Sequence, residues 1–119
     1  MMSGFQELQK RFDLEMNKLA PKERVPGFIR YCREVVSAFE KKEITMGEAG
    51  QLLFLGNLYD KDLTAYFKSS PDVFITDEIL DIAGDLEELA YYPDYYNKVV
   101  HKDPDRDWAR VVKLVNAFQ

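Results

Sequence analysis

Cysteine and histidine are nearly absent from this chain of 119 residues, which has one of each, Cys32 and His101. One cysteine cannot form a disulfide within the chain, which agrees with a reducing compartment such as the cytoplasm. Zinc sites need more cysteines and histidines than the chain has. Cys32 also falls on the apolar side of a predicted helix, where a thiol is buried and is a poor nucleophile. We therefore predict that the protein is not an enzyme, with no catalytic residue and no metal or cofactor site.

Long hydrophobic runs are lacking as well. The longest cover a few residues, as in 52–55, far short of the ~18 that a membrane span needs. The N-terminus has no basic segment followed by an apolar one, so no secretory signal is predicted. Hydrophobic residues make up 46% and charged residues 31%, which is typical of a packed globular protein. We expect one domain over residues 1–119, soluble and cytoplasmic, without a membrane partner, and a monomer or weak dimer.

Period-two alternation is missing too, and apolar residues recur at intervals of three and four instead. Proline and glycine divide the chain into pieces of helical length. Long helices are predicted over about 5–20, 26–42, 77–90 and 104–118, and shorter ones over about 45–55 and 58–68, with a break near Gly56. In the last three long helices the residues predicted to face the core are Phe28, Ile29, Cys32, Val36 and Phe39; Ile79, Ile82, Ala83, Leu86, Leu89 and Ala90; and Trp108, Val111, Val112, Val115 and Phe118. The predicted fold is all-α, an antiparallel helical bundle of four long helices plus one or two shorter ones.

Several helix starts are marked by their own residues. Thr45 is followed three residues later by a glutamate, the pattern of a capping box. Thr76 is predicted to cap the helix over 77–90, and Pro26 to be the first residue of the helix over 26–42. The aspartates within 103–107 suit a helix start, with Asp103 as its cap, better than a calcium loop, because Trp108 stands where such a loop needs glycine.

Basic residues are absent between Lys68 and Lys98, yet this window holds eight carboxylates. It contributes −8 to a net charge of −5, so the rest of the chain sums to +3. At 100° per residue, four of the carboxylates lie within about 80° of one another, opposite the apolar side of their helix. We name these four residues the acidic ridge: Asp77, Asp81, Asp85 and Glu88.

The acidic ridge has two interpretations. It can be an ordinary outer helix face that lysines from other helices neutralise, or it can bind a basic partner such as a nuclease. Four tyrosines that follow it would add contact surface at low entropic cost. Binding to nucleic acid is disfavoured, because the one concentration of charge has the wrong sign. The predicted partner-binding residues are Asp77, Asp81, Asp85, Glu87, Glu88, Tyr91, Tyr92, Asp94, Tyr95 and Tyr96.

Two segments resemble a known group, the small helical immunity proteins of bacterial toxins. Residues 39–48, Phe-Glu-Lys-Lys-Glu-Ile-Thr-Met-Gly-Glu, are similar to the group's helix end, Ile-Ser/Thr and acidic helix start. Residues 85–94, Asp-Leu-Glu-Glu-Leu-Ala-Tyr-Tyr-Pro-Asp, are similar to its acidic helix and aromatic-Pro-Asp turn. The resemblance is to the colicin D immunity type and to immunity proteins of contact-dependent growth inhibition. It implies a non-catalytic protein that covers the basic substrate-binding surface of a cognate toxin, typically an RNase. The contacts it implies are Asp81, Asp85, Glu87, Glu88, Tyr91, Tyr92 and Asp94.

Two alternatives stay open. A helical adaptor or regulatory subunit would dock a partner through an apolar groove, with Leu53, Phe54, Leu58 and Tyr59 exposed beside the break near Gly56. A carboxylate-metal hydrolase would need several carboxylates that converge in an interior pocket, whereas those of the acidic ridge are predicted to face away from the core.

Overall fold

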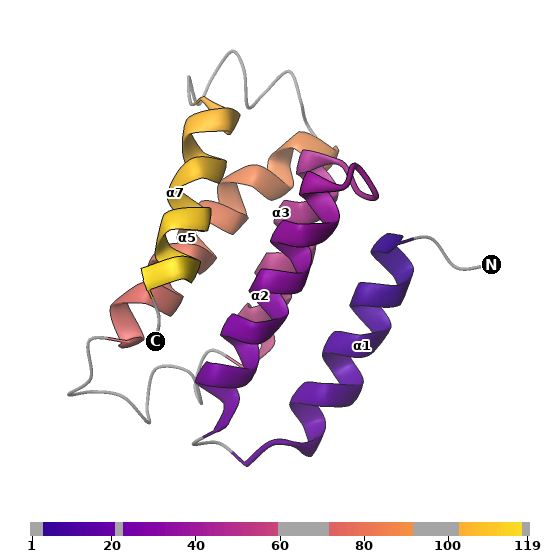
Figure 1. Ribbon diagram of the computed structural model, residues 1–119, viewed down its shortest axis with the longest axis vertical. Coiled ribbons are helices and arrows are strands. Elements are labelled where there is room, and N and C mark those ends of the chain that lie inside the picture. The colour runs from indigo at the N-terminus through magenta and orange to yellow at the C-terminus, as the bar shows by residue number, and fades with distance from the viewer. Residues whose placement is uncertain (1–3, 21–22, 60–71, 92–102, 118–119) are drawn as a thin grey trace.

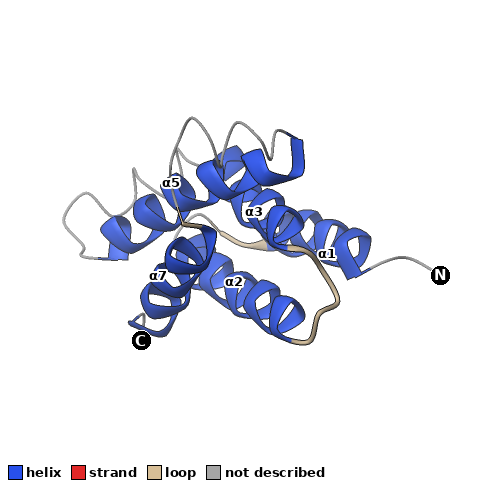
Figure 2. Ribbon diagram, turned by 90° about the horizontal axis from the view of Figure 1, so that it is seen from above, coloured by secondary structure: helices blue, strands red, loops and turns tan. Residues whose placement is uncertain are grey.

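The computed structural model of the chain describes residues 4–20, 23–59, 72–91 and 103–117. As predicted, its regular structure in these ranges is all helical, and no strand occurs there (Figure 2). None of these helices is both long and apolar enough to cross a membrane. In chain order the elements are α1 (Gly4–Lys18), α2 (Arg24–Glu40), α3 (Met46–Phe54), the 3₁₀ helix η2 (Leu55–Tyr59), α5 (Asp72–Tyr91) and α7 (Pro104–Ala117).

Helix α2 is the centre of the arrangement. It contacts α1, α3, α5 and α7, and Figure 1 shows it between α1 and α7. The most extensive helix pair is α3 with α5, and α5 also packs on α7. Seen from above in Figure 2, α5 and α3 lie over α7 and α2. Helix α5 therefore has a neighbour on two of its sides.

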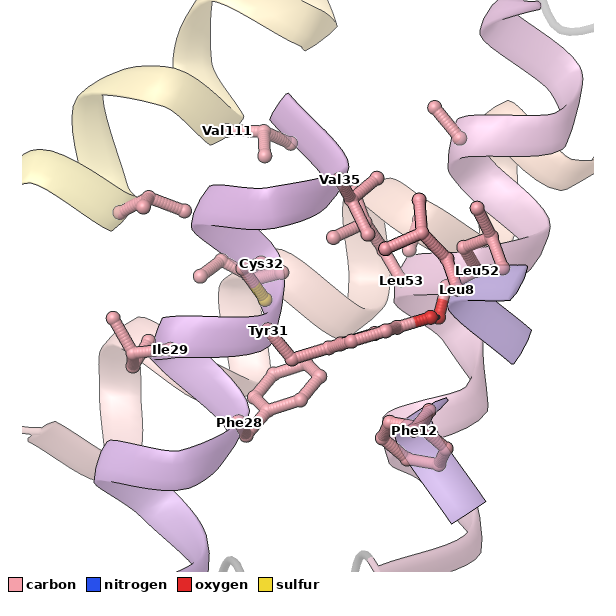
Figure 3. Close-up of a cluster of buried hydrophobic side chains, with 14 of the residues drawn as sticks. Leu8, Phe12, Phe28, Ile29, Tyr31, Cys32, Val35, Leu52, Leu53 and Val111 are labelled. Atoms are coloured by element: carbon pink, nitrogen blue, oxygen red, sulfur yellow. Dashed lines mark hydrogen bonds between the residues drawn. The ribbon is translucent and has the colours of Figure 1, made fainter. Parts of the chain in front are cut away.

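The periodic apolar residues of α1 and α2 form one part of the core, as predicted. Phe12 of α1 and Cys32 of α2 are fully buried. Tyr31 of α2, which the predicted apolar stripe left out, is buried beside them with its ring centroid 4.7 Å from that of Phe12. Its hydroxyl donates a hydrogen bond of 2.8 Å to the backbone oxygen of Leu52 in α3 (Figure 3). Burial raises the pKa of the Tyr31 hydroxyl, so this donor keeps its proton.

Helix α7 closes the other side of the core. Trp108, Val111 and Val115 are buried, as their spacing predicted. The Trp108 ring packs on Phe39 of α2, with ring centroids 4.6 Å apart. Phe118, also predicted to face the core, lies outside the described residues.

Two predicted helix caps are confirmed. The Thr45 hydroxyl accepts from the Glu48 backbone N–H at 3.2 Å, and the Glu48 carboxylate accepts from the Thr45 backbone N–H at 2.9 Å. At the start of α7, a carboxylate oxygen of Asp103 accepts from the backbone N–H groups of Asp105 and Arg106. These bonds satisfy N–H groups that have no acceptor within their own helix.

Two helices begin earlier than predicted. Helix α2 starts at Arg24, so Pro26 is its third residue; proline is tolerated there because N–H groups of the first turn lack helical acceptors. Helix α5 starts at Asp72, and Thr76 is fully buried inside it instead of capping it. Ile75 explains the difference, because it packs against the core and extends the apolar stripe by one turn.

Helix α3 ends at Phe54 and continues as η2, which agrees with the predicted break near Gly56. Gly50 of α3 has a role in packing. A Cβ atom at Gly50 would lie 2.6 Å from the backbone nitrogen of Glu87 and 2.7 Å from the carbonyl carbon of Leu86. The backbones of α3 and α5 therefore approach closely. The helix predicted over 58–68 lies outside the described residues apart from its first two positions, which belong to η2.

Gly50→Ala is expected to lower the free energy of unfolding by about 1–3 kcal/mol, because the added methyl group meets the backbone of α5. In a helix without such a contact, the same change stabilises by up to ~1 kcal/mol, so the sign of the effect is diagnostic. Urea denaturation followed by circular dichroism measures it. Gly84→Ala is the control, since its Cβ would lie 3.2 Å from the edge of the Phe54 ring, and a small change is expected. Stabilisation by Gly50→Ala would contradict the close approach of α3 and α5.

Candidate partner-binding surface

The contacts of α5 with α3 and α7 determine which way the acidic ridge faces. Ile79, Ala83 and Leu86 are fully buried, as predicted. Leu80 is buried as well, which the predicted stripe missed. More of the surface of α5 is therefore covered than a single apolar stripe indicates.

The acidic ridge is only partly open to solvent, contrary to the expectation of an outer face. Asp81 is exposed, whereas Asp77, Asp85 and Glu88 are half-buried. Asp77 and Asp85 also interact with other groups of the chain. The physical reason is that α7 packs along α5, so part of the ridge borders another helix instead of water.

A hollow of about 380 Å³ lies between these two helices. Carboxylates of the acidic ridge form one of its walls, and α7 supplies the other. We name it the α5–α7 hollow. Its lining residues are Glu78, Asp81, Ile82 and Asp85 of α5 and Arg106, Asp107 and Arg110 of α7.

Ion pairs between described residues lie in this lining. A guanidinium nitrogen of Arg110 is 2.9 Å from a carboxylate oxygen of Glu78, which joins α7 to α5. Within α7, a guanidinium nitrogen of Arg106 is 3.7 Å from a carboxylate oxygen of Asp107. The Glu78–Arg110 side chains are 44% and 61% exposed, so this pair is worth ~0–1 kcal/mol. Among the described residues, four carboxylates against two guanidinium groups leave the lining with a net charge of −2.

Among the described residues, one carboxylate of the acidic helix is therefore neutralised by another helix, and the partner is an arginine, Arg110. The α7 residues were missed as members of the site. Arg106 and Arg110 do stand four residues apart on the side of α7 opposite Val111 and Val115, so the spacing was a usable signal. The spacing alone does not say which neighbouring helix they face.

The remaining predicted site residues lie apart from the hollow or beyond the described chain. Glu87 is half-buried, and its backbone packs near Gly50 of α3. Burial raises the pKa of the Glu87 carboxyl, and the negative charge of Glu88 raises it further. Tyr91 is the last residue of α5. The other predicted contacts lie outside the described residues: Tyr92, Asp94, Tyr95 and Tyr96.

The structure also describes parts of the other candidate sites, namely the apolar groove near Gly56, the Cys32 thiol and a metal site. The predicted exposure of Leu53 is wrong, because this side chain is fully buried, and Phe54 packs partly against the core. Leu58 is 71% exposed.

Burial raises the pKa of the Cys32 thiol, and His101 lies outside the described residues. Within the described ranges, no group of three or more His, Cys, Asp or Glu side chains is arranged to hold a metal ion.

Comparisons with known protein families, curated proteins and solved structures found no match to this chain. What the surface can do therefore has to be inferred from its own chemistry. Its carboxylates attract cations, and Ile82 offers the hollow a patch of apolar contact. This combination suits a basic protein surface.

Glu87→Gln is expected to stabilise the protein at pH 7, by at most about 0.5 kcal/mol for a half-buried position. Because folding raises the pKa of Glu87, the folded state holds this proton more tightly than the unfolded state does. The stability that this carboxyl contributes is present below its ordinary pKa of 4.5 and is lost as pH rises through the raised value.

Thermal unfolding of both proteins between pH 3.5 and 7 measures this, and the difference should vanish at the acidic end. Asp13→Asn, which removes an exposed carboxylate of α1, controls for the loss of one charge. A benefit from Glu87→Gln that is constant across this range would contradict the assignment.

Proposed function

We propose that this protein is a non-catalytic immunity protein, an inhibitor that binds the basic nuclease domain of a bacterial toxin through the acidic side of α5. The observation that carries the proposal is the α5–α7 hollow, whose described lining residues keep a net charge of −2 after the arginines of α7 are counted. The resemblance of residues 39–48 and 85–94 to helical immunity proteins supports the choice of partner. In this proposal the chain is an antiparallel bundle that works in the cytoplasm as a monomer or weak dimer.

Electrostatic attraction is the first step of binding in this proposal. Helix α5 contains no lysine or arginine along its 20 residues, so the charges of its own side chains are all negative. The field of these charges steers a basic partner from a distance of about one Debye length, roughly 8–10 Å in physiological salt. Association is therefore fast and weakens as salt concentration rises.

Close contact is the second step. Asp81 is the exposed residue of the acidic ridge and meets the partner directly. Asp77, Glu87 and Glu88 act mainly through their charge, because they are half-buried. Aromatic residues at and after the end of α5 provide the central contacts, since tyrosine buries a large area with little loss of entropy. These aromatic residues, with the aspartate between them, are Tyr91, Tyr92, Asp94, Tyr95 and Tyr96.

The proposal is tested with the small basic domain encoded at the end of the adjacent reading frame in the genome, purified and titrated calorimetrically. Replacing Asp81, Asp85 and Glu88 together by lysine is expected to weaken binding at least ~100-fold, because three attractive contacts become repulsive. The far-ultraviolet circular dichroism spectrum should stay helical. Binding of the original protein should weaken steadily between 50 and 300 mM salt, as screening predicts.

A second triple variant controls for net charge. Asp13, Glu15 and Glu23 are exposed on α1 and just before α2, and lysine at all three makes the same change in charge away from the site. This control should lose less than about threefold in affinity. Equal loss in both triple variants, or no binding of the toxin domain by the original protein, would show the proposal to be wrong.

A further inference from the structure

The α5–α7 hollow combines a charged rim with an apolar contact. Ile82 lines it and also packs partly against the hydrophobic core, so contacts with core side chains hold Ile82 in position. Asp81, one residue before it, is exposed and carries a carboxylate at the rim. A ligand that fills the hollow therefore meets an aliphatic surface and a negative charge next to each other.

Few chemical groups match both features. A small metal ion has no apolar part to place on Ile82, and a phosphate is repelled by a lining of net charge −2. Arginine and lysine side chains have an aliphatic stem that contacts apolar surface and a cationic head that reaches polar groups. Arginine adds a planar fork that can pair with a carboxylate through two hydrogen bonds.

We propose that the α5–α7 hollow binds one arginine or lysine side chain of the partner, with its stem on Ile82 and its cationic head at Asp81. This inference rests on the proposed function and specifies which part of the partner the acidic side of α5 recognises. The binding residue of the partner is thus a protruding basic side chain, and the rest of its basic surface interacts through the wider field of α5.

Arg110 sets the limit of this site. Its guanidinium group is 2.9 Å from the Glu78 carboxylate and lines the same hollow. It occupies one acidic group of the wall and places a positive charge at that end. A second basic side chain is repelled there, so Arg110 determines that the hollow accepts one cationic head and not two.

The test uses the full ¹⁵N-labelled chain and two blocked tripeptides, acetyl-Gly-Arg-Gly-amide and its citrulline analogue, which has nearly the same shape without the charge. Nuclear magnetic resonance titration should show saturable shifts at Asp81, Ile82 and Arg110 with the arginine peptide, and none with the citrulline peptide. Asp81→Asn should weaken binding at least threefold, whereas Asp13→Asn, at an exposed carboxylate of α1, should leave it unchanged.

A second pair of variants tests the role of Arg110. Arg110→Gln should strengthen binding of the arginine peptide two- to threefold, because it frees Glu78 and removes a repelling charge. Lys113→Gln removes one positive charge from an exposed position of α7 that does not line the hollow, and it should have no effect. Equal gains from both variants would mean that only bulk charge matters and would overturn the assignment to Arg110.

Shifts that spread over the exposed carboxylates of α1 without saturation would show an adventitious association only, and the inferred site would be wrong. The peptide can fail to bind the hollow while the triple variant of Asp81, Asp85 and Glu88 still has a lower affinity for the toxin domain. The proposed function then stands without this site. If the hollow binds the peptide but the chain binds no toxin domain, the site stands and the proposed function fails.

Discussion

The close approach of α3 and α5 at Gly50 is the constraint on which the rest of the structure depends. Because residues of a helix are separated by 100°, a single backbone contact determines the rotation of α5 about its own axis. With Leu86 held against α3, Ala83 faces the core and Asp81 faces outward. The direction in which the acidic ridge faces thus follows from the lack of a side chain at Gly50 of α3.

Helix α3 can serve as this support because its own ends are secured. The capping box at Thr45 satisfies its first turn, and the buried Tyr31 hydroxyl bonds to the Leu52 oxygen near its last turn. Helix α7 then supplies what α5 lacks, a positive charge, through Arg110. The repulsion among the carboxylates of α5 is reduced in this way, while the surface that they form keeps its negative sign.

The local parts of this fold could be predicted from sequence, and the tertiary parts could not. The caps at Thr45 and Asp103 depend on side chains and backbone groups within three residues of each other, so their pattern is visible in the sequence. The prediction that Thr76 caps its helix was wrong, because a residue that can cap a helix can also lie inside one when apolar neighbours extend the helix. The burial of Leu53 and the pairing of Arg110 depend on which helices become neighbours, and no periodicity within one helix contains that information.

The position of Trp108 has a practical consequence. It is the one tryptophan of the chain, it is buried against Phe39, and it directly follows Asp107 of the α5–α7 hollow. Its indole is buried on the core side of α7, away from Arg106 and Arg110, so the protein carries an intrinsic fluorophore that reports on the packing of α7 against α2. Loss of this packing on unfolding can therefore be followed by light emission from the unlabelled chain, in real time and at concentrations far below those that calorimetry requires.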